Sequence, residues 1–211
     1  MWVRSEYANE LAVLSAWVAM LVPWAVSTHT HETVGGDIEN GIFFLRFPLF
    51  ELQLRSPGFI EIDGELVPAD EIIAEGERFV DAYPGTELAG DVFVTTPPTS
   101  LAFYDGALWQ ASLLWTVAAA AFATAFVFSL VLYFREERVV ERLPVAPVRL
   151  MGALLGVGAL GTAGASVLYY LERDMVGTPI PIGVLVIGAL ALVLLRTKQI
   201  EPTEDAVSES A

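Results

Sequence analysis

The chain has 211 residues, of which 55 % are hydrophobic and only 18 % are charged, whereas soluble domains carry about 25 % charged residues. Its net charge of −15 argues against nucleic acid as a partner, because phosphate binding needs clustered basic residues. The complete lack of cysteine excludes a disulfide framework, a thiolate metal site and a cysteine nucleophile.

The charges are unusual in kind as well as in number. There are 26 acidic and 11 basic residues, and Lys198 is the only lysine. An acidic, lysine-poor surface is typical of proteins in concentrated salt, where a Debye length of about 3 Å screens the repulsion between like charges. We therefore expect a halophilic source, with an ordinary acidic membrane protein as the alternative.

Four long, nearly uncharged apolar stretches dominate the chain, at residues 11–26, 107–134, 151–171 and 180–195. A helix needs about 20 apolar residues to cross a hydrocarbon layer of about 30 Å, and in lipid the backbone must satisfy its own polar groups. The pattern predicts an all-α membrane fold with four transmembrane helices. A small extracellular α+β insert is expected between the first and second helices.

The first stretch has a second interpretation as a cleaved signal peptide, because Ala25-Val26-Ser27 fits a small-x-small cleavage site. Its nearly neutral start argues against that interpretation. Trp24 near its outer end is placed like an interfacial anchor, which favours a retained span.

Residues 27–106, the expected insert, contain strand patterns and one helical pattern. Phe50, Leu52 and Leu54 alternate with Glu51, Gln53 and Arg55, which predicts a half-buried strand. Further strands are expected over 59–62 and 91–95.

Two other parts of the insert have their own patterns. The more continuously apolar residues 42–47 either extend the strand that follows them or lie on the membrane surface. A proline followed by acidic residues predicts a helix over 68–83. Because so small a domain buries little apolar surface alone, we expect the insert to lean on the outer ends of the spans.

Basic residues near span ends tend to stay in the cytoplasm, so their placement predicts the orientation. Most of them lie before the first span, between the second and third spans, or just after the fourth: Arg4, Arg135, Arg138, Arg142, Arg149, Arg196 and Lys198. We therefore expect a multi-pass protein of the cell membrane with residues 1–10, 135–150 and 196–211 in the cytoplasm. Residues 27–106 and the turn 172–179 would lie outside the cell.

The third stretch is rich in glycine, and small residues four positions apart let helices approach closely. One interpretation is a contact between two copies of the chain, which would make a homo-oligomer. The favoured one is packing against other helices of the same chain, because bundled helices need small residues between them. The candidate helix-packing residues are Gly152, Gly156, Gly158, Gly161 and Gly164.

One cluster has the residue types of a metal site, namely His29, His31 and Glu32. Two histidines two positions apart point to the same side of a strand, and a carboxylate would add a third ligand. The favoured interpretation is a polar exit from the membrane, so we predict no metal site. We also predict no cofactor and no catalytic residue, since the sequence has no phosphate loop, dinucleotide fingerprint or zinc-protease motif.

The spans contain almost no ionisable residue, which disfavours an ion-coupled transporter. Their serine and threonine hydroxyls are expected to bond a neighbouring helix or a carbonyl of their own helix rather than to line a pathway.

Four short segments carry a resemblance: residues 4–17, Pro23-Trp24, Arg46-Phe47-Pro48 and the start of the third span at 151–155. Together they resemble an uncharacterised family of haloarchaeal multi-span membrane proteins, a domain of unknown function. The resemblance implies a source and an architecture. It transfers no functional residue, because that family has no known activity.

The sequence thus predicts a non-enzymatic structural, accessory or interaction protein of the cell envelope. Its expected partners are the lipid bilayer and a membrane or envelope protein. The alternative is a small-solute channel, a transporter component or a membrane sensor. An enzyme is a third class, but the paired carboxylates outside the spans are better explained as a solvated acidic face.

Overall fold

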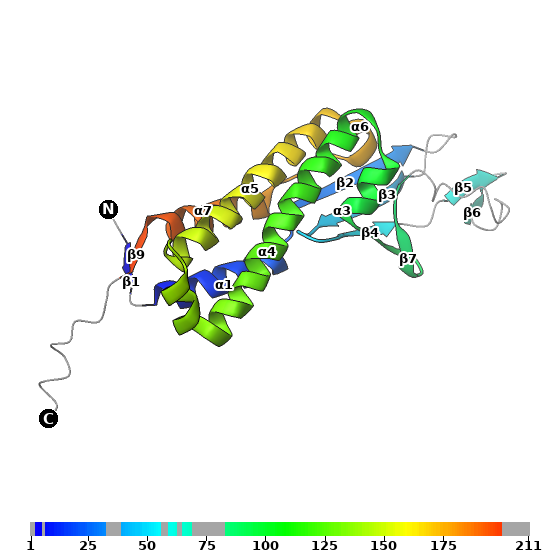
Figure 1. The fold of residues 1–211 in the computed structure, drawn as a ribbon. Helices are drawn as coiled ribbons and strands as arrows, with labels where there is room; N and C mark the ends of the chain where they lie inside the picture. The colour runs from blue at the N-terminus through cyan, green and yellow to red at the C-terminus, as the bar shows by residue number, and fades with distance from the viewer. Residues whose placement is uncertain are drawn as a thin grey trace, which may run out of the picture.

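The computed structural model describes residues 3–5, 7–32, 39–55, 59–62, 65–68 and 83–199. Figure 1 shows helices that run side by side and a sheet that extends from one end of them. The described helices are α1 (Ala8–Leu21), α3 (Pro97–Phe103), α4 (Gly106–Arg142), α5 (Pro147–Leu171), α6 (Arg173–Val176) and α7 (Ile182–Arg196).

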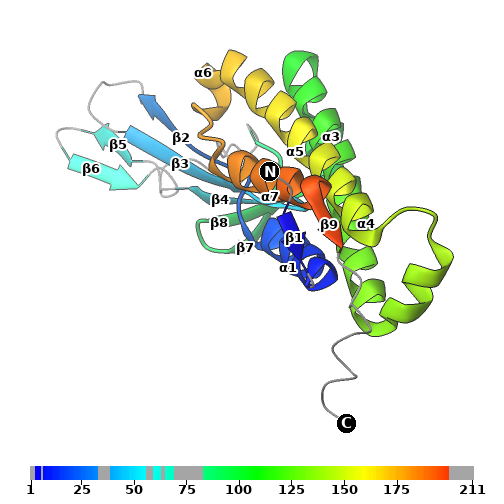
Figure 2. The ribbon, with the colours of Figure 1, turned by 90° about the vertical axis from the view of Figure 1, so that its left-hand side faces the viewer.

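The main sheet is antiparallel and has five strands in the order β2-β3-β4-β8-β7 (Figure 2). Its strands are β2 (Ala25–Glu32), β3 (Glu39–Arg46), β4 (Glu51–Arg55), β7 (Thr86–Ala89) and β8 (Val92–Thr95). Two small sheets add to it. Strands β5 (Phe59–Ile62) and β6 (Glu65–Pro68) form a hairpin, and β1 (Val3–Ser5) pairs in parallel with β9 (Thr197–Gln199).

The prediction of an all-α membrane fold with four transmembrane helices is wrong. Among the described helices only α4 and α5 are long and apolar enough to cross a membrane. Helices α1 and α7 have 14 and 15 residues. At 1.5 Å per residue they span about 21 to 23 Å, which is short of a hydrocarbon layer of about 30 Å. The five-stranded sheet is also more than a minor insert in a helical protein.

Prolines set one end of each of the two outer helices. The first stretch stops being helical at Val22, which is extended (φ −87°, ψ 125°) just before Pro23, and β2 begins at Ala25. In the last stretch Pro181 sits at the N-cap, so helix α7 starts only at Ile182. Helices α4 and α5 alone are a weak indication of membrane association, because the core helix of a soluble protein has the same length and composition.

Several predictions for the segment between the first two apolar stretches are confirmed. The alternating residues form β4, the apolar residues 42–47 fall largely in β3 and so extend the sheet, and the expected strands over 59–62 and 91–95 are β5 and β8. Strands β2, β6 and β7 and the short helix α3 were not predicted. Most of the helix expected over 68–83 lies outside the described residues.

Helix α5 lies between α4 and α7, and small residues bring the three helices close together (Figure 2). A Cβ atom added to Gly158 would overlap the ring of Phe122 on α4. One added to Gly161 would lie 3.0 Å from Cβ of Ala118 on the same helix. The glycine-rich face of α5 therefore packs against a helix of its own chain.

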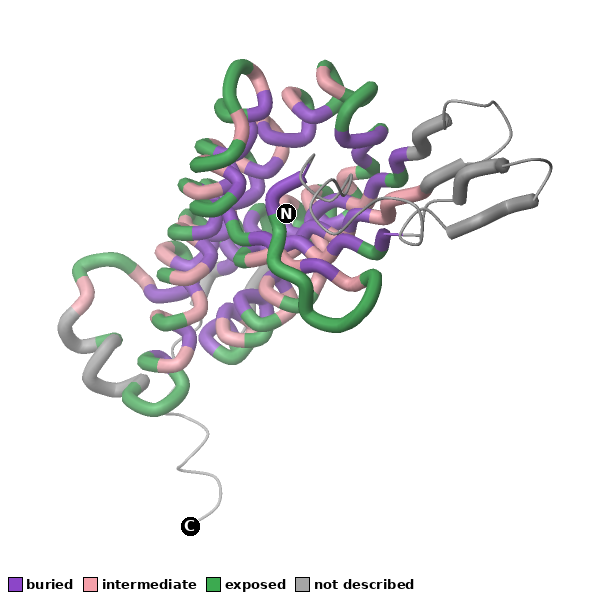
Figure 3. The backbone as a smooth tube through the Cα atoms, turned by 90° about the vertical axis from the view of Figure 1, so that its right-hand side faces the viewer, coloured by how far each residue is buried: buried purple, intermediate pink, exposed green. Residues whose placement is uncertain are grey.

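The other predicted packing glycines face either α4 or α7. A Cβ atom on Gly164 would lie 2.9 Å from Cδ1 of Leu114 on α4. A Cβ atom on Gly152 would lie 3.0 Å from side-chain atoms of α7, while Gly156 has more room, with Ala191 at 4.0 Å. Figure 3 shows the result, since buried positions recur along the helices with exposed positions between them.

Candidate functional site

The sheet meets the helices through a row of buried polar side chains. Arg46 ends β3, and Glu51, Gln53 and Arg55 alternate along β4, so all four point to the same face of the sheet. None of them is more than 9 % exposed. We call these four residues the junction cluster. The polar side of the predicted strand is therefore its more buried side, whereas Leu54 on the opposite face is 42 % exposed.

An ion pair forms the centre of the junction cluster. Arg46 and Glu51 are directly opposite each other across β3 and β4, and Arg46 Nε lies 2.6 Å from Glu51 Oε2. The Nε–H bond does not point along that line, so the contact is an ion pair rather than a linear hydrogen bond. The Arg46 guanidinium also lies over the rings of Phe44 and Tyr169, with its carbon 4.8 and 4.5 Å from their centroids.

Each member of the ion pair makes a further hydrogen bond within the chain. Arg46 Nη1 donates to Ser27 Oγ at 2.7 Å, and that hydroxyl donates to the Val176 carbonyl of α6 at 3.0 Å. Glu51 Oε1 accepts from Gln53 Nε2 at 2.7 Å. A buried charge pair needs such extra bonds, because desolvation of the two charges otherwise outweighs their attraction.

The outer half of the junction cluster is held by the segment before β7. Gln53 Nε2 donates to the Pro84 carbonyl at 3.0 Å, and Gln53 Oε1 accepts from Arg55 Nη2 at 2.5 Å. Arg55 in turn lies over the ring of Phe93, 4.0 Å from its centroid. Burial lowers the pKa of Arg55, although Tyr104 and Glu51 oppose that shift.

Tyrosine and serine hydroxyls surround the junction cluster on the helix side. Ser100 Oγ of α3 and Ser112 Oγ of α4 lie 2.8 Å apart, and the Tyr169 hydroxyl of α5 interacts with both. Burial, followed by the negative charge of Glu51, raises the pKa of Tyr104 well above its ordinary value. Three helices and the sheet thus meet around neutral hydroxyl groups and one ion pair.

Tyr83 closes the cluster on the side of α6. Its hydroxyl donates to the Met175 carbonyl at 2.7 Å, and its ring packs edge-on against Phe44. Burial raises the pKa of Tyr83 to about 12, even though the positive charge of Arg55 works in the opposite direction. The hydroxyl is therefore a neutral donor at physiological pH.

The residues of the predicted metal cluster fall on β2. The side chain of His29 is buried, its ring centroid lies 6.4 Å from that of Tyr83, and it borders a hollow of ≈ 400 Å³ between strands β2, β3 and β4. The side chains of His31 and Glu32 lie outside the described part of the structure. Within the described part, no three histidine, aspartate or glutamate side chains come together as a metal site.

The hydroxyls within the long helices bond to their own backbone, as predicted. Thr116 Oγ1 donates to the Ser112 carbonyl at 2.7 Å and Thr124 Oγ1 donates to the Ala120 carbonyl at 2.7 Å. On α5 the hydroxyl of Thr162 donates to the Gly158 carbonyl at 2.9 Å. These groups are satisfied within one helix and need no partner in a pathway.

The junction cluster was not predicted, although the sequence contains a signal for it. Arg46 and Glu51 have opposite charges and flank the four residues 47–50, which include a proline. A four-residue connection between two strands places its flanking residues opposite each other. Their pairing was thus foreseeable, but their burial against α5 depends on packing that no local pattern reveals.

Comparison with known proteins identifies a family but no activity. A family model described as "Family of unknown function (DUF7549)" matches residues 1–199. No curated protein matches the chain. The match spans the helices, the sheet and the junction cluster alike. The chain therefore belongs to the uncharacterised family DUF7549.

Proposed function

We propose that this protein is a non-enzymatic accessory or interaction protein of the cell envelope, anchored in the membrane by α4 and α5. The observation that carries the proposal is the junction cluster. It fixes a folded sheet to one end of an apolar helix layer and has both oxygens of its only carboxylate engaged by neighbours in the chain. Such an arrangement positions a domain and leaves no evident nucleophile or base for catalysis.

The outer faces of the helices support a lipid environment. Less than half of either candidate span is buried within the chain. On α5 the side chain of Leu160 is 76 % exposed, and on α4 that of Val127 is 58 % exposed. Exposed apolar patches of this extent mark membrane or protein contacts. The shorter helices widen the same surface, as Leu185 of α7 is 73 % exposed.

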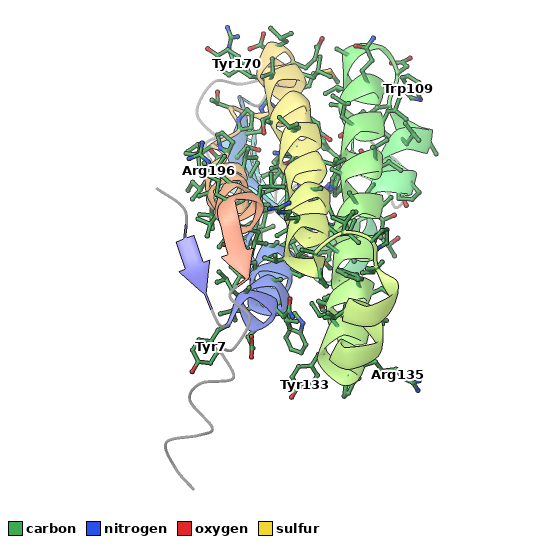
Figure 4. All side chains as sticks on the ribbon, turned by 60° about the vertical axis from the view of Figure 1, so that its left-hand side comes forward. Tyr7, Trp109, Tyr133, Arg135, Tyr170 and Arg196 are labelled. Carbon is green, nitrogen blue, oxygen red and sulfur yellow. The ribbon has the colours of Figure 1, made fainter. Side chains whose placement is uncertain are left out.

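Aromatic side chains lie at both ends of this surface. Figure 4 places Trp109 and Tyr170 at one end, and Tyr7 and Tyr133 at the other. Trp109 and Tyr133 are about 36 Å apart along α4, at 1.5 Å per residue. That separation suits aromatic belts on the two sides of a hydrocarbon layer of about 30 Å.

Arginine placement supports an orientation with the sheet outside the cell. Arg135 lies at the end of α4 that is remote from the sheet (Figure 4), and Arg149 lies in the first turn of α5, the next helix along the chain. Basic residues near span ends stay on the cytoplasmic side. We also propose that the protein comes from a haloarchaeon and that its chain crosses the membrane more than once. Both proposals rest on the acidic, lysine-poor composition and on the family resemblance.

A passive channel is the less favoured function. The described hydroxyls of α4 and α5 bond to carbonyls of their own helices, and the glycine-rich face of α5 is filled by α4 and α7. A pore of small solutes needs polar groups that face a common lumen. The proposal therefore places the sheet, rather than the helix layer, in contact with the partner.

Site-specific photo-crosslinking in intact cells tests the proposal. A photoreactive residue replaces Leu88 on β7, which is 59 % exposed, and a matched variant carries it at Leu160 on α5. We expect one recurrent protein adduct from position 88 and lipid adducts from position 160. No protein adduct from position 88, together with solute flux through vesicles that contain this protein alone, would overturn the proposal in favour of a channel.

A further inference from the structure

The turn between β3 and β4 reaches into the helix layer instead of staying with the sheet. It comprises Phe47, Pro48, Leu49 and Phe50, and the Phe47 N–H closes it on the Phe50 carbonyl at 2.8 Å. All four are apolar residues. Pro48 is buried, whereas Leu49 at the tip is 37 % exposed. An apolar tip at the end of a sheet needs an apolar environment.

Two buried tryptophans hold this turn. Trp24, just after α1, donates its indole N–H to the Phe47 carbonyl at 3.1 Å. The indole N–H of Trp115 on α4 is shared between two acceptors, the Phe47 carbonyl at 3.2 Å and the Pro48 carbonyl at 3.1 Å. Both tryptophans are 0 % exposed. The two carbonyls at the head of the turn therefore have donors that do not depend on water.

The place of Trp115 on α4 gives the depth of the turn. It lies six positions beyond Trp109, which is about 9 Å further along the helix and away from the sheet. Trp109 belongs to the aromatic belt near the sheet (Figure 4). A turn held by Trp115 thus lies inside that belt, at a depth where irregular backbone is tolerated only if its polar groups are satisfied by protein.

The base of the same hairpin carries the Arg46–Glu51 ion pair, so its charges are neutralised where the chain enters the layer. We propose that the β3–β4 turn is a re-entrant element that inserts its tip, Leu49, among the acyl chains of one membrane leaflet. The occupant of the tip surface is lipid, because Leu49 is an apolar side chain that stays 37 % exposed at the depth at which Trp115 holds the turn, inside the aromatic belt. This inference rests on the proposed membrane anchoring.

The chain has no cysteine, so single-cysteine variants can report the depth directly. Leu49→Cys, Leu160→Cys as a lipid control and Leu88→Cys as a water control are labelled with bimane in vesicles of phosphatidylglycerol and phosphatidylcholine. We expect quenching at position 49 by lipids that carry a nitroxide on the upper part of an acyl chain. Quenching by aqueous iodide there should be at least about five-fold weaker than at position 88, since water is absent from the hydrocarbon layer.

Three outcomes would overturn the inference, and they differ in what they imply. Iodide quenching at position 49 as strong as at position 88, with position 160 protected, leaves the membrane anchoring intact but removes the re-entrant turn. Protection at position 49 without quenching by nitroxide lipid shows that protein covers the tip. Strong iodide quenching at all three positions contradicts the membrane anchoring itself.

A second variant tests the role of the indole donor. Trp115→Phe keeps an aromatic ring, although a smaller one, and removes the donor to the Phe47 and Pro48 carbonyls, whereas Trp109→Phe makes the same change at an exposed position. We expect Trp115→Phe to raise iodide quenching at position 49 at least two-fold and Trp109→Phe to leave it unchanged. Equal quenching in both variants would show that the indole does not hold the turn in place.

Discussion

The helix layer and the sheet junction are held together by opposite kinds of contact. Between α4, α5 and α7, glycine and alanine allow close apolar packing that has little directional preference. At the junction, a buried arginine and a buried glutamate are tied into hydrogen bonds whose geometry is specific. The difference indicates that apolar packing builds the layer, whereas the ion pair fixes how the sheet is set upon it.

The largest effect is expected from breaking the ion pair. Glu51→Ala leaves Arg46 charged, buried and without its partner, which should cost about 3–5 kcal/mol of unfolding free energy. The matched change Glu87→Ala lies on the exposed strand β7 and should cost less than about 0.5 kcal/mol. Chemical unfolding in a mild detergent, followed by tryptophan fluorescence, measures both. Equal costs would show that the junction does not depend on the pair.

The helix layer should be most sensitive where glycine meets a ring. Gly158→Ala pushes a methyl group into Phe122 and should destabilise by about 1–3 kcal/mol. In Gly188→Ala on α7 the new Cβ has no neighbour within 4 Å apart from the adjacent residues and the backbone of its own helix, so the change should be neutral or stabilise by up to about 1 kcal/mol, the helix-propensity gain. The same unfolding measurement compares them. A neutral Gly158→Ala would argue against tight packing of α4 on α5.

High pH should loosen the junction through Tyr83. Burial raises its pKa to about 12 in the folded state, while the unfolded value is about 10, so the folded protein retains the proton more tightly. The associated stability is fully present below pH 10 and is lost as the pH rises through 12. The loss should be of the order of 2 kcal/mol. In Tyr83→Phe this part of the pH dependence should vanish, and an unchanged pH profile would contradict the assignment.

The smallest effect is expected from a hydrogen bond between two helices. Trp17 Nε1 of α1 donates to Ser129 Oγ of α4 at 3.1 Å, but its side chain is 43 % exposed. Trp17→Phe should therefore cost about 1 kcal/mol or less. Thermal unfolding in detergent measures this change, and Trp109→Phe serves as the control. A cost above that of Gly158→Ala would mean that polar contacts also matter within the helix layer.

Local sequence patterns predicted which residues form helices and strands better than they predicted which faces of those elements are buried. Helices α4 and α5 follow from long apolar runs, and β4 follows from strict alternation. Alternation separates two faces of a strand, but it does not say which one meets the core. The polar face of β4 can be buried because other parts of the chain supply partners: Glu51 pairs with Arg46 of β3, Gln53 donates to the Pro84 carbonyl, and Arg55 lies over the ring of Phe93.

The first apolar stretch shows that a local pattern also fails to reveal where a helix ends. Its hydrophobicity continues past Pro23 into Ala25 and Val26, so a count of apolar residues gave one long span. In the structure Val26 and Ile180 exchange two backbone hydrogen bonds at 3.1 and 2.7 Å, and this pairing ties β2 to the segment before α7. A contact between residues so far apart in sequence leaves no periodic signal near either of them.

Hydrogen–deuterium exchange in lipid nanodiscs, on the wild type and on Glu51→Ala, tests most directly whether the ion pair couples the sheet to the helices. We expect the amides of β3, β4 and β8 to lose protection in the variant while those in the middle of α4 and α5 keep it. Equal loss of protection in both regions, or no loss in the sheet, would contradict the account.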